Sequence, residues 1–316
     1  MSESVLFDSP GPKARARHRL GAAAGAVVIL AFLGFALVKL QSTGQLEADK
    51  WKPFIGIPVN GIDANVWTDY LLPGLVNTLK AAAISIVFAV VFGFLFGIGR
   101  MSQVTPIRWF CTIVVELFRS VPVLVMMLGA FFYFVYNNVF VAELNSLAAV
   151  VVGLTLYNGS VVAELLRSGV GSLPKGQAEA GLSIGMTRGQ TLRAIQLPQA
   201  VTAMLPALVG QLVVVLKDTA LGQIITYPEL LNTYQQIGST WSNIVPAMFV
   251  IALIFIAINY TLTTLAGRIE RRLRRRGRAT LAPGGGGAPT LAAAAAGPDA
   301  SGLRADEPEA EPADAR

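Results

Sequence analysis

An all-α membrane protein with about six transmembrane helices is the fold class that the sequence predicts, from its composition and the length of its apolar segments. Of the 316 residues, 53% are hydrophobic and only 14% are charged, whereas soluble proteins average about 25% charged residues. Crossing a hydrocarbon core of about 30 Å takes about 20 apolar residues in a helix. We expect spans at 20–40, 71–99, a third ending in 121–141, and at 144–163, 197–216 and 244–267.

The distribution of positive charge predicts the orientation of these helices. Lys and Arg gather before the first span and in alternate connections. By the positive-inside rule, both termini and the connection 167–196 are therefore cytoplasmic, in a multi-pass protein of the cell membrane. The formal net charge of +6 is then a topology signal and not a nucleic-acid-binding stripe. The clusters are Lys13, Arg15, Arg17 and Arg19; Arg100 and Arg108; Arg167, Lys175, Arg188 and Arg193; and Arg268, Arg271, Arg272, Arg274, Arg275, Arg276 and Arg278.

The chain divides into five stretches. The apolar run 20–40 is longer than the core of a secretory signal and has no evident small-residue cleavage site after it, which favours an uncleaved helix. Trp51 and Trp67 could anchor the next connection at the membrane interface. From Ala279 the chain is rich in Ala, Pro and Gly, which predicts disorder. The stretches are a basic cytoplasmic N-terminus at 1–19, an extra helix at 20–40, an extracytoplasmic connection at 41–70, a five-helix core at 71–268 and a tail at 269–316.

Side chains for metal or cofactor chemistry are scarce. The only cysteine, Cys111, is expected to be a small apolar residue of a helix, and the only histidine, His18, lies in a basic tail. Neither a metal nor another cofactor is therefore predicted. A G-x-x-x-x-G-K-[ST] phosphate loop is absent from the sequence, so we expect no ATPase site in this chain.

The most informative segment is 177–200, QAEAGLSIGMTRGQTLRAIQLPQA. It is typical of a short helix, a break at Gly185, a second helix, and Pro198 in the first turn of the following span. Glu179 is an acidic residue in an otherwise positive, protruding loop, which indicates a contact with another protein.

This segment resembles the signature of ABC-importer permeases, E-A-A, three residues, G, nine residues, I, one residue, L-P. The positions that match are Glu179, Ala180, Gly185, Ile195, Leu197 and Pro198. Gly181 departs from the usual third alanine, a small-for-small change that should leave docking possible. The resemblance implies that the loop is the coupling helix, which sits in a cleft of a separate ATPase subunit. The residues assigned to coupling are Lys175, Gln177, Ala178, Glu179, Ala180, Gly181, Gly185 and Met186.

Flanking motifs resemble the polar amino-acid branch of these permeases, over about 71–268. The branch implies a type I importer fold, a second permease subunit in a homo- or heterodimer, an external substrate-binding protein, and a polar amino-acid substrate, for which glutamate fits. The motifs are LVNTL at 75–79, ELFRSVPVL at 116–124, YNGSVVAELLRSG at 157–169 and KDT at 217–219.

Charges within the spans must face protein or water, because a charge at the bilayer centre costs about 2.5–3.5 kcal/mol. Glu116 and Arg119 are three residues apart and can pair on one helix face, as can Glu164 and Arg167. We interpret both as structural ion pairs, with a substrate role as the alternative for the first and a translocation-path role as the alternative for the second.

Adjacent Lys217 and Asp218 follow twenty uncharged residues and precede Thr219. Adjacent helical residues do not face each other, so the two charges engage different partners. If the helix breaks here, they line a cavity or gate; otherwise they lie at headgroup level. The candidates for the translocation path are Tyr157, Glu164, Lys217, Asp218 and Thr219.

Two other classes of protein compete with this interpretation. An ion-gradient-driven secondary transporter would need no ATPase and usually has more spans with inverted repeats. An intramembrane enzyme would have to work from an isolated carboxylate such as Glu164. Co-purification with an ATPase distinguishes the importer from both.

Overall fold

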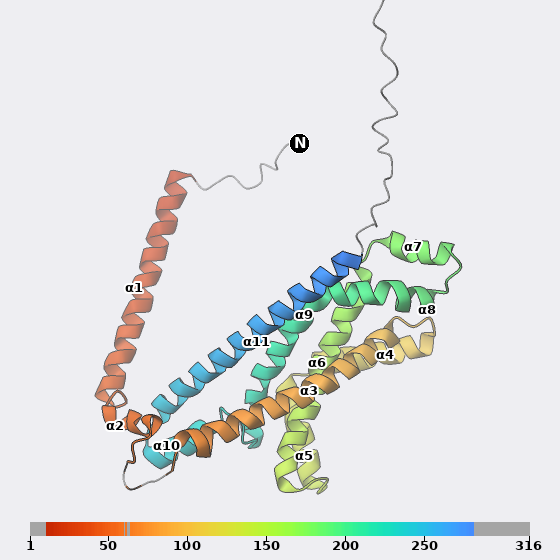
Figure 1. Cartoon of the computed structure of the whole chain (residues 1–316). Helices are drawn as coiled ribbons and strands as arrows, with labels where there is room; N and C mark the ends of the chain where they lie inside the picture. Colours follow the sequence, from red (N-terminus) through yellow and green to blue (C-terminus); the bar gives the residue numbers. More distant parts are fainter. Residues whose placement is uncertain (1–10, 60, 62–63, 281–316) are drawn as a thin grey trace, which may run out of the picture. The chain divides into compact units, whose positions relative to one another are not determined.

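The computed structural model describes residues 11–59, 61 and 64–280, and the all-α class is confirmed for them (Figure 1). By internal contacts the chain forms two units, Met1–Leu273 and Arg274–Arg316, and every site below lies in the first. In chain order the helices are α1 (Pro12–Ser42), α2 (Ala48–Trp51), η1 (Lys52–Ile55), η2 (Val66–Leu71), α3 (Leu72–Arg100), α4 (Thr105–Ser120), α5 (Val123–Tyr136), α6 (Ala142–Gly171), α7 (Lys175–Ser183), α8 (Arg188–Thr191), η3 (Leu192–Gln196), α9 (Leu197–Asp218), η4 (Thr219–Ile225), α10 (Thr233–Trp241) and α11 (Ile244–Thr280).

Among the described residues, five helices are long and apolar enough to span a membrane, and a bent pair makes up to six. The bent pair is α4 and α5, which meet at 98°. The predicted third span, which ends in 121–141, is therefore bent. Val121 is extended (φ −89°, ψ 129°), because the ring of Pro122 disfavours a helical conformation in the residue before it.

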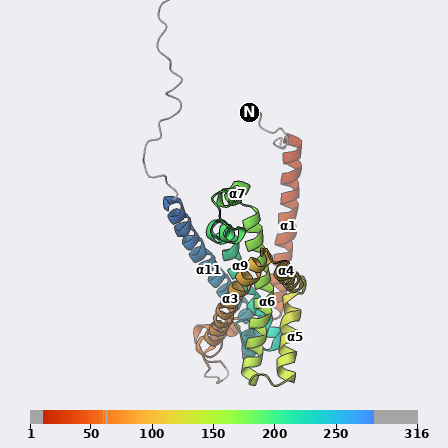
Figure 2. The same cartoon turned by 90° about the vertical axis from the view of Figure 1, so that its right-hand side faces the viewer.

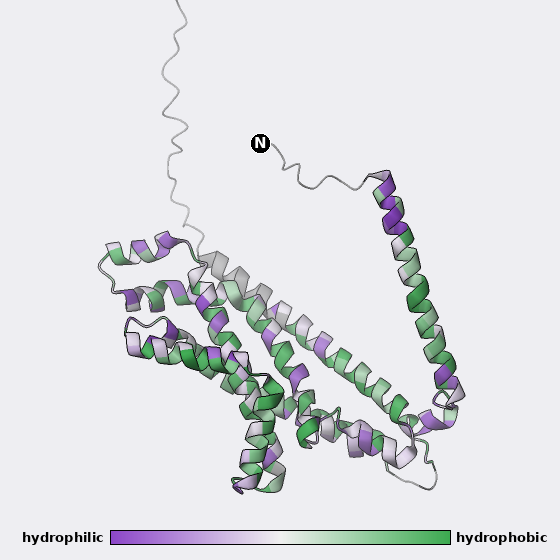
Figure 3. Ribbon diagram, turned by 180° about the vertical axis from the view of Figure 1, so that it is seen from behind, coloured by the Kyte–Doolittle hydropathy of each residue, from purple (hydrophilic) through white to green (hydrophobic). Residues whose placement is uncertain are grey.

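The expected extra N-terminal helix is present as α1, but it begins earlier than predicted. Pro12 opens it, since proline has a helical φ and needs no hydrogen bond in the first turn. Part of the predicted basic N-terminus is consequently helical. None of the residues in the most apolar stretch of α1 is buried, and Figure 3 shows hydrophobic residues around the middle of this helix. This surface is typical of a helix that faces lipid.

The central helix of the bundle is α6, and 61% of the residues in its most apolar stretch are buried. It packs most extensively against α3 and also against α5 and α9; Figure 2 shows α5 beside it. Small residues on α3 allow the close approach. A Cβ at Gly93 would lie 2.4 Å from Val162 Cγ1, and one at Gly97 would lie 3.2 Å from Ala163 Cα. Close packing of small residues is the usual adhesive between membrane helices.

The fifth span is longer than predicted and includes the second helix of the hairpin. From Arg188 to Ile225 the chain forms one continuous helical segment. It widens to a π-helix at η3 just before Pro198 and tightens to a 3-10 helix at η4. The wider turn accommodates a residue that has no backbone N–H. The helix does not break at Lys217 and Asp218; it ends at Thr226, whose φ is +56°.

A cap forms where α2, η1, η2 and α10 meet the ends of α3 and α11, around buried Phe54, Leu230 and Trp241. Both tryptophans of the external connection belong to it. The Trp51 ring lies 5.9 Å from that of Phe249, and Trp67 Nε1 donates to the Phe54 carbonyl oxygen at 2.7 Å. These contacts attach the connection to the bundle; the interface role of Trp67, whose ring is 46% exposed, stays a prediction.

Within the cap, Glu229 is fully buried. Its carboxylate accepts hydrogen bonds from the backbone N–H groups of Leu231 and Asn232, both at 2.7 Å. Burial raises the pKa of Glu229 from 4.5 to about 7, although these two donors favour the ionised form. Burial, with a smaller contribution from the nearby Glu229 charge, raises the pKa of Tyr227 to about 12.

We expect the stability of the chain to fall as pH rises from about 4.5 to about 7. In this window the folded chain keeps the Glu229 proton that the unfolded chain has released, so the free energy of unfolding declines with pH. The loss is roughly 3 kcal/mol and levels off above the folded pKa. Unfolding midpoints in detergent across this range measure the slope. Glu229→Gln should remove the slope and exposed Glu47→Gln should keep it; equal slopes in both variants would contradict the assignment.

The C-terminal boundaries differ in part from the predicted ones. Helix α11 continues past the expected end of the core at Arg268 and ends at Thr280. The disorder predicted from Ala279 onward falls mostly on 281–316, which lies outside the described residues.

Candidate functional site

The segment with the permease signature folds as a helical hairpin at one end of α6 (Figures 1 and 2). Its first helix, α7, ends at Ser183, and Gly185 follows in the left-handed region with φ +84°. The Met186 N–H then donates to the Gly181 carbonyl oxygen at 3.1 Å. A left-handed glycine with such a bond is a common helix terminator, because other residues are strained there. Gly185 therefore makes the break that the sequence predicts.

The second helix of the hairpin begins with a capping box. Thr187 Oγ1 accepts from the Gln190 N–H at 3.3 Å, and Gln190 Oε1 accepts from the Thr187 N–H at 2.8 Å. The two side chains thus provide hydrogen-bond acceptors for two backbone N–H groups that would otherwise lack partners. This box, which the sequence interpretation overlooked, was detectable as T-x-x-Q at 187–190.

Gly181 packs against the second helix of the hairpin. It is buried, and a Cβ there would lie 2.8 Å from Thr191 Cγ2, 2.9 Å from Thr191 Oγ1 and 3.1 Å from Ile195 Cδ1. The departure from the usual alanine therefore matches a close approach between the two helices. The sequence interpretation treated glycine and alanine at position 181 as equivalent, because it did not foresee this contact with Thr191 and Ile195.

We expect Gly181→Ala, which restores the family residue, to destabilise the hairpin by roughly 1–3 kcal/mol, the usual cost of overpacking. Limited proteolysis of the hairpin measures the effect. Thr191→Ala removes both of the nearest side-chain atoms, so the double variant Gly181→Ala/Thr191→Ala should regain protection. Protease sensitivity of the double variant equal to that of Gly181→Ala would contradict this packing.

The residues assigned to coupling differ in their exposure. Lys175, Glu179 and Ala180 are exposed. Ala178 instead lines a groove beside α3 and α4, and Gln177 Oε1 accepts from Gln199 Nε2 at 3.0 Å. The exposed residues are thus available to a partner, while Gln177 attaches α7 to α9.

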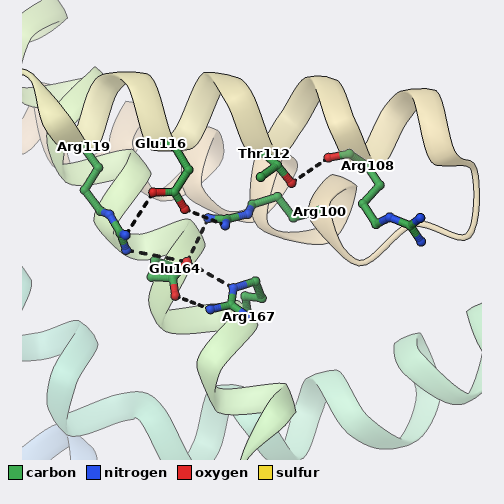
Figure 4. Close-up of polar contacts among 7 residues, drawn as sticks. All are labelled: Arg100, Arg108, Thr112, Glu116, Arg119, Glu164 and Arg167. Atoms are coloured by element: carbon green, nitrogen blue, oxygen red, sulfur yellow. Dashed lines mark hydrogen bonds and ion pairs between the residues drawn. The ribbon is translucent and has the colours of Figure 1, made fainter.

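Five charged side chains meet near the C-terminal ends of α3, α4 and α6 (Figure 4). The two pairs with a spacing of three residues are present: Arg119 Nη2 lies 3.0 Å from Glu116 Oε2, and Arg167 Nη2 lies 2.5 Å from Glu164 Oε1. Arg100, at the end of α3, joins them. Its Nη2 lies 2.8 Å from Glu116 Oε1 and its Nη1 lies 2.8 Å from Glu164 Oε2.

Arg100 is the residue of this network that the sequence interpretation missed, since it was counted only among the basic residues of a loop. Its side chain is only 6% exposed. A guanidinium has a planar fork of donors, so it can bridge two carboxylates where an ammonium would not. The network therefore ties three helices together directly beside the hairpin. No local spacing signals it, because its members come from distant parts of the chain.

A second polar contact lies deeper between the helices. Gln211 Nε2 on α9 donates to Asn158 Oδ1 on α6 at 2.5 Å, and Asn158 Nδ2 donates to the Leu154 carbonyl oxygen. Hydrogen bonds between membrane helices contribute about 0.6–2 kcal/mol each. This bond connects α6, which precedes the hairpin, with α9, which continues from its second helix.

The structure does not gather the predicted translocation-path residues into one site. Thr219 is buried and donates to the Leu216 carbonyl oxygen at 2.7 Å, while Glu164 belongs to the charge network. Lys217 is exposed and Asp218 is half-buried. Neither side chain makes an ion pair or hydrogen bond with a described residue. Tyr157 is half-buried on α6.

Comparisons with known proteins agree with this architecture. A family model described as binding-protein-dependent transport system inner membrane component matches residues 55–275. Glutamate transport system permease protein GluD of Corynebacterium glutamicum is 50% identical over 235 residues, which are 74% of this chain and 84% of the relative. The probable glutamine ABC transporter permease protein GlnP of Bacillus subtilis is 34% identical over 206 residues, or 64% of this chain and 93% of the relative.

Solved structures give the same result. The crystal structure of an amino acid ABC transporter with histidines superposes with a TM-score of 0.61 and 27% identity, covering 68% of this chain and all of that chain. The chain therefore belongs to the family of binding-protein-dependent transport system inner membrane components, the permease subunits of ABC importers. The predicted resemblance to the amino-acid branch of these permeases is confirmed.

Proposed function

We propose that this chain is the permease subunit of an importer that carries a polar amino acid of the glutamate type, driven by a separate ATPase. The observation that carries the proposal is the glycine-broken hairpin with an exposed Glu179 face, in a chain 50% identical to a glutamate transport permease. A transport subunit of this kind provides the path for the substrate and the hairpin that moves with the ATPase, and ATP hydrolysis provides the free energy.

The hairpin is built to transmit a displacement to two spans at once. A connection of only three residues, 172–174, joins α6 to α7, and α8 continues into α9 without a break. The Asn158–Gln211 hydrogen bond and the charge network then hold α6 to α9, α3 and α4. In this proposal, closure of the ATPase moves the hairpins of two permease subunits together and switches the path between inward and outward openings. Such a transition is alternating access.

Polar side chains on α6, α9 and η4 are the proposed contacts for substrate. Lys217 and Asp218 have opposite charges, and neither makes an ion pair or a hydrogen bond with a described residue, while an amino acid carries both a carboxylate and an ammonium. Tyr157 and Thr219 are the other members of the proposed path. An unsatisfied charge in a membrane helix is retained where it faces water or a ligand.

The proposal includes three protein partners and a topology. A second permease, identical or related, completes the path, and a substrate-binding protein delivers the amino acid at the end of the bundle with the cap. The ATPase binds at the hairpin end. Both termini are then cytoplasmic and the chain lies in the cell membrane, in accordance with the positive-inside rule.

The test is reconstitution of this chain with its neighbouring transport subunits in proteoliposomes. We expect the ATPase to co-purify with the chain, and uptake of glutamate to require both ATP inside and the binding protein outside. Uptake that proceeds without the ATPase on an imposed ion gradient would contradict the proposal. ATP-dependent uptake of a different amino acid, with glutamate excluded, would retain the importer and reject the substrate.

A further inference from the structure

A groove of about 1050 Å³ lies between the α3–α4 turn and the hairpin. Its walls are largely apolar: Phe96 comes from α3, Phe110 from α4 and Leu182 from α7. Ligand sites in proteins commonly have volumes of about 300–1,000 Å³. The groove is therefore large enough for a ligand.

The charged residues that line the groove all have the same sign. Arg188 and Arg193 line it, and of the described lining residues none is acidic. Both arginines are exposed, and neither guanidinium has an ion-pair or hydrogen-bond partner in the described part of the chain. Two unpaired guanidiniums at an apolar groove favour a ligand with an anionic head, and guanidinium geometry matches phosphate oxygens.

The position of the groove indicates where its ligand comes from. The α3 wall is the end of the candidate span Val66–Arg100, and α4 is half of the bent pair. On α4, Trp109 and Phe110 are 68% and 58% exposed, and aromatic rings in such positions are typical of the headgroup level of a membrane. An apolar groove at this level is open to acyl chains.

The groove adjoins the surface assigned to the ATPase. Ala178 and Leu182, one turn apart on α7, both line it, while Lys175 and Glu179 are exposed and do not. The spacing of the four residues places them on the same side of the helix. A ligand in the groove therefore lies next to the residues proposed to meet the ATPase.

We propose that the groove binds an anionic phospholipid of the leaflet at the hairpin end of the bundle. The phosphate lies between Arg188 and Arg193, and the acyl chains pack along Phe96, Phe110 and Leu182. The lipid fills the space behind the hairpin and supports it against α3 and α4. The reconstituted transporter should accordingly retain phosphatidylglycerol in preference to phosphatidylcholine.

Native mass spectrometry of the assembled transporter, supplied with either lipid, tests the proposal. We expect Arg188→Gln/Arg193→Gln to weaken phosphatidylglycerol retention roughly thirtyfold, since each cation near a membrane surface strengthens binding on the order of fivefold and the two factors multiply. Arg108→Gln, an exposed arginine of α4 that does not line the groove, should retain the lipid. Arg188→Lys/Arg193→Lys should keep most of the preference, which separates loss of charge from loss of hairpin structure.

Three outcomes would overturn the proposal. One is equal retention of the two lipids by the unaltered chain, and another is undiminished retention by the double glutamine variant. The third is retention by the permease alone that disappears when the ATPase binds, because the groove would then be part of the ATPase interface. None of these results bears on whether the chain transports amino acids, so the two proposals fail separately.

Discussion

Replacing Arg100 by Met is expected to destabilise the chain by roughly 3 kcal/mol, the lower end of the range for breaking a buried ion pair. The Met side chain fills similar space but leaves Glu116 and Glu164 without their shared partner. The lower end applies because both carboxylates are partly exposed and retain contacts with Arg119 and Arg167. Chemical denaturation in detergent measures the loss. Arg100→Lys should be intermediate, since one ammonium replaces a two-armed fork.

Arg108→Met is the matched control for this variant. Arg108 is exposed on α4, close to the network in sequence, and its side chain has no ion pair with a described residue. We expect its stability to stay within about 0.5 kcal/mol of the unaltered chain. If the two Met variants unfolded at the same denaturant concentration, Arg100 would not be the residue that joins the three helices.

Replacing Gly185 by Val is expected to reduce transport about tenfold or more while the membrane bundle stays folded, because left-handed backbone strains a side chain by at least 1–2 kcal/mol. No atom lies within 4 Å of a Cβ at this position, so the strain arises from φ +84° alone. A β-branched residue suits this region least. Uptake and ATP hydrolysis in proteoliposomes measure the effect, and a secondary carrier should tolerate the change.

Gly176→Val is the control for the backbone argument. Gly176 is in α7, also with no atom within 4 Å of a Cβ, but its backbone is helical. The same added side chain therefore causes no conformational strain there, and transport should remain near that of the unaltered chain. Equal losses in the two variants would show that added bulk, and not the turn at Gly185, impairs the hairpin.

Features set by neighbouring residues could be predicted from the sequence. The apolar runs predict the spans, because lipid requires them to be helical. The spacing of three residues predicts the Glu116–Arg119 and Glu164–Arg167 pairs, because helix geometry places such residues on one face. Gly185 predicts the break in the hairpin for an equally local reason. These features need no knowledge of which helices lie side by side.

Features set by packing between distant segments could not be predicted. Arg100 bridges carboxylates that are 16 and 64 positions away, and its burial depends on how α3 meets α6. Glu229 is buried only because the cap closes over it. The close approach at Gly181 likewise depends on the separation of the two hairpin helices. The bend between α4 and α5 is an intermediate case: Pro122 marks its place, but the 98° angle comes from packing against α6.

Crosslinking of Glu179 to the ATPase tests the central proposal most directly. Because Cys111 is the only cysteine, Cys111→Ala gives a cysteine-free chain into which Glu179→Cys can be introduced. With a cysteine series along the ATPase surface, we predict a disulfide-linked permease–ATPase product whose yield changes on adding ATP. If Glu179→Cys instead reacted with a membrane-impermeant thiol reagent added outside intact cells, the hairpin would lie on the wrong side of the membrane to meet an ATPase.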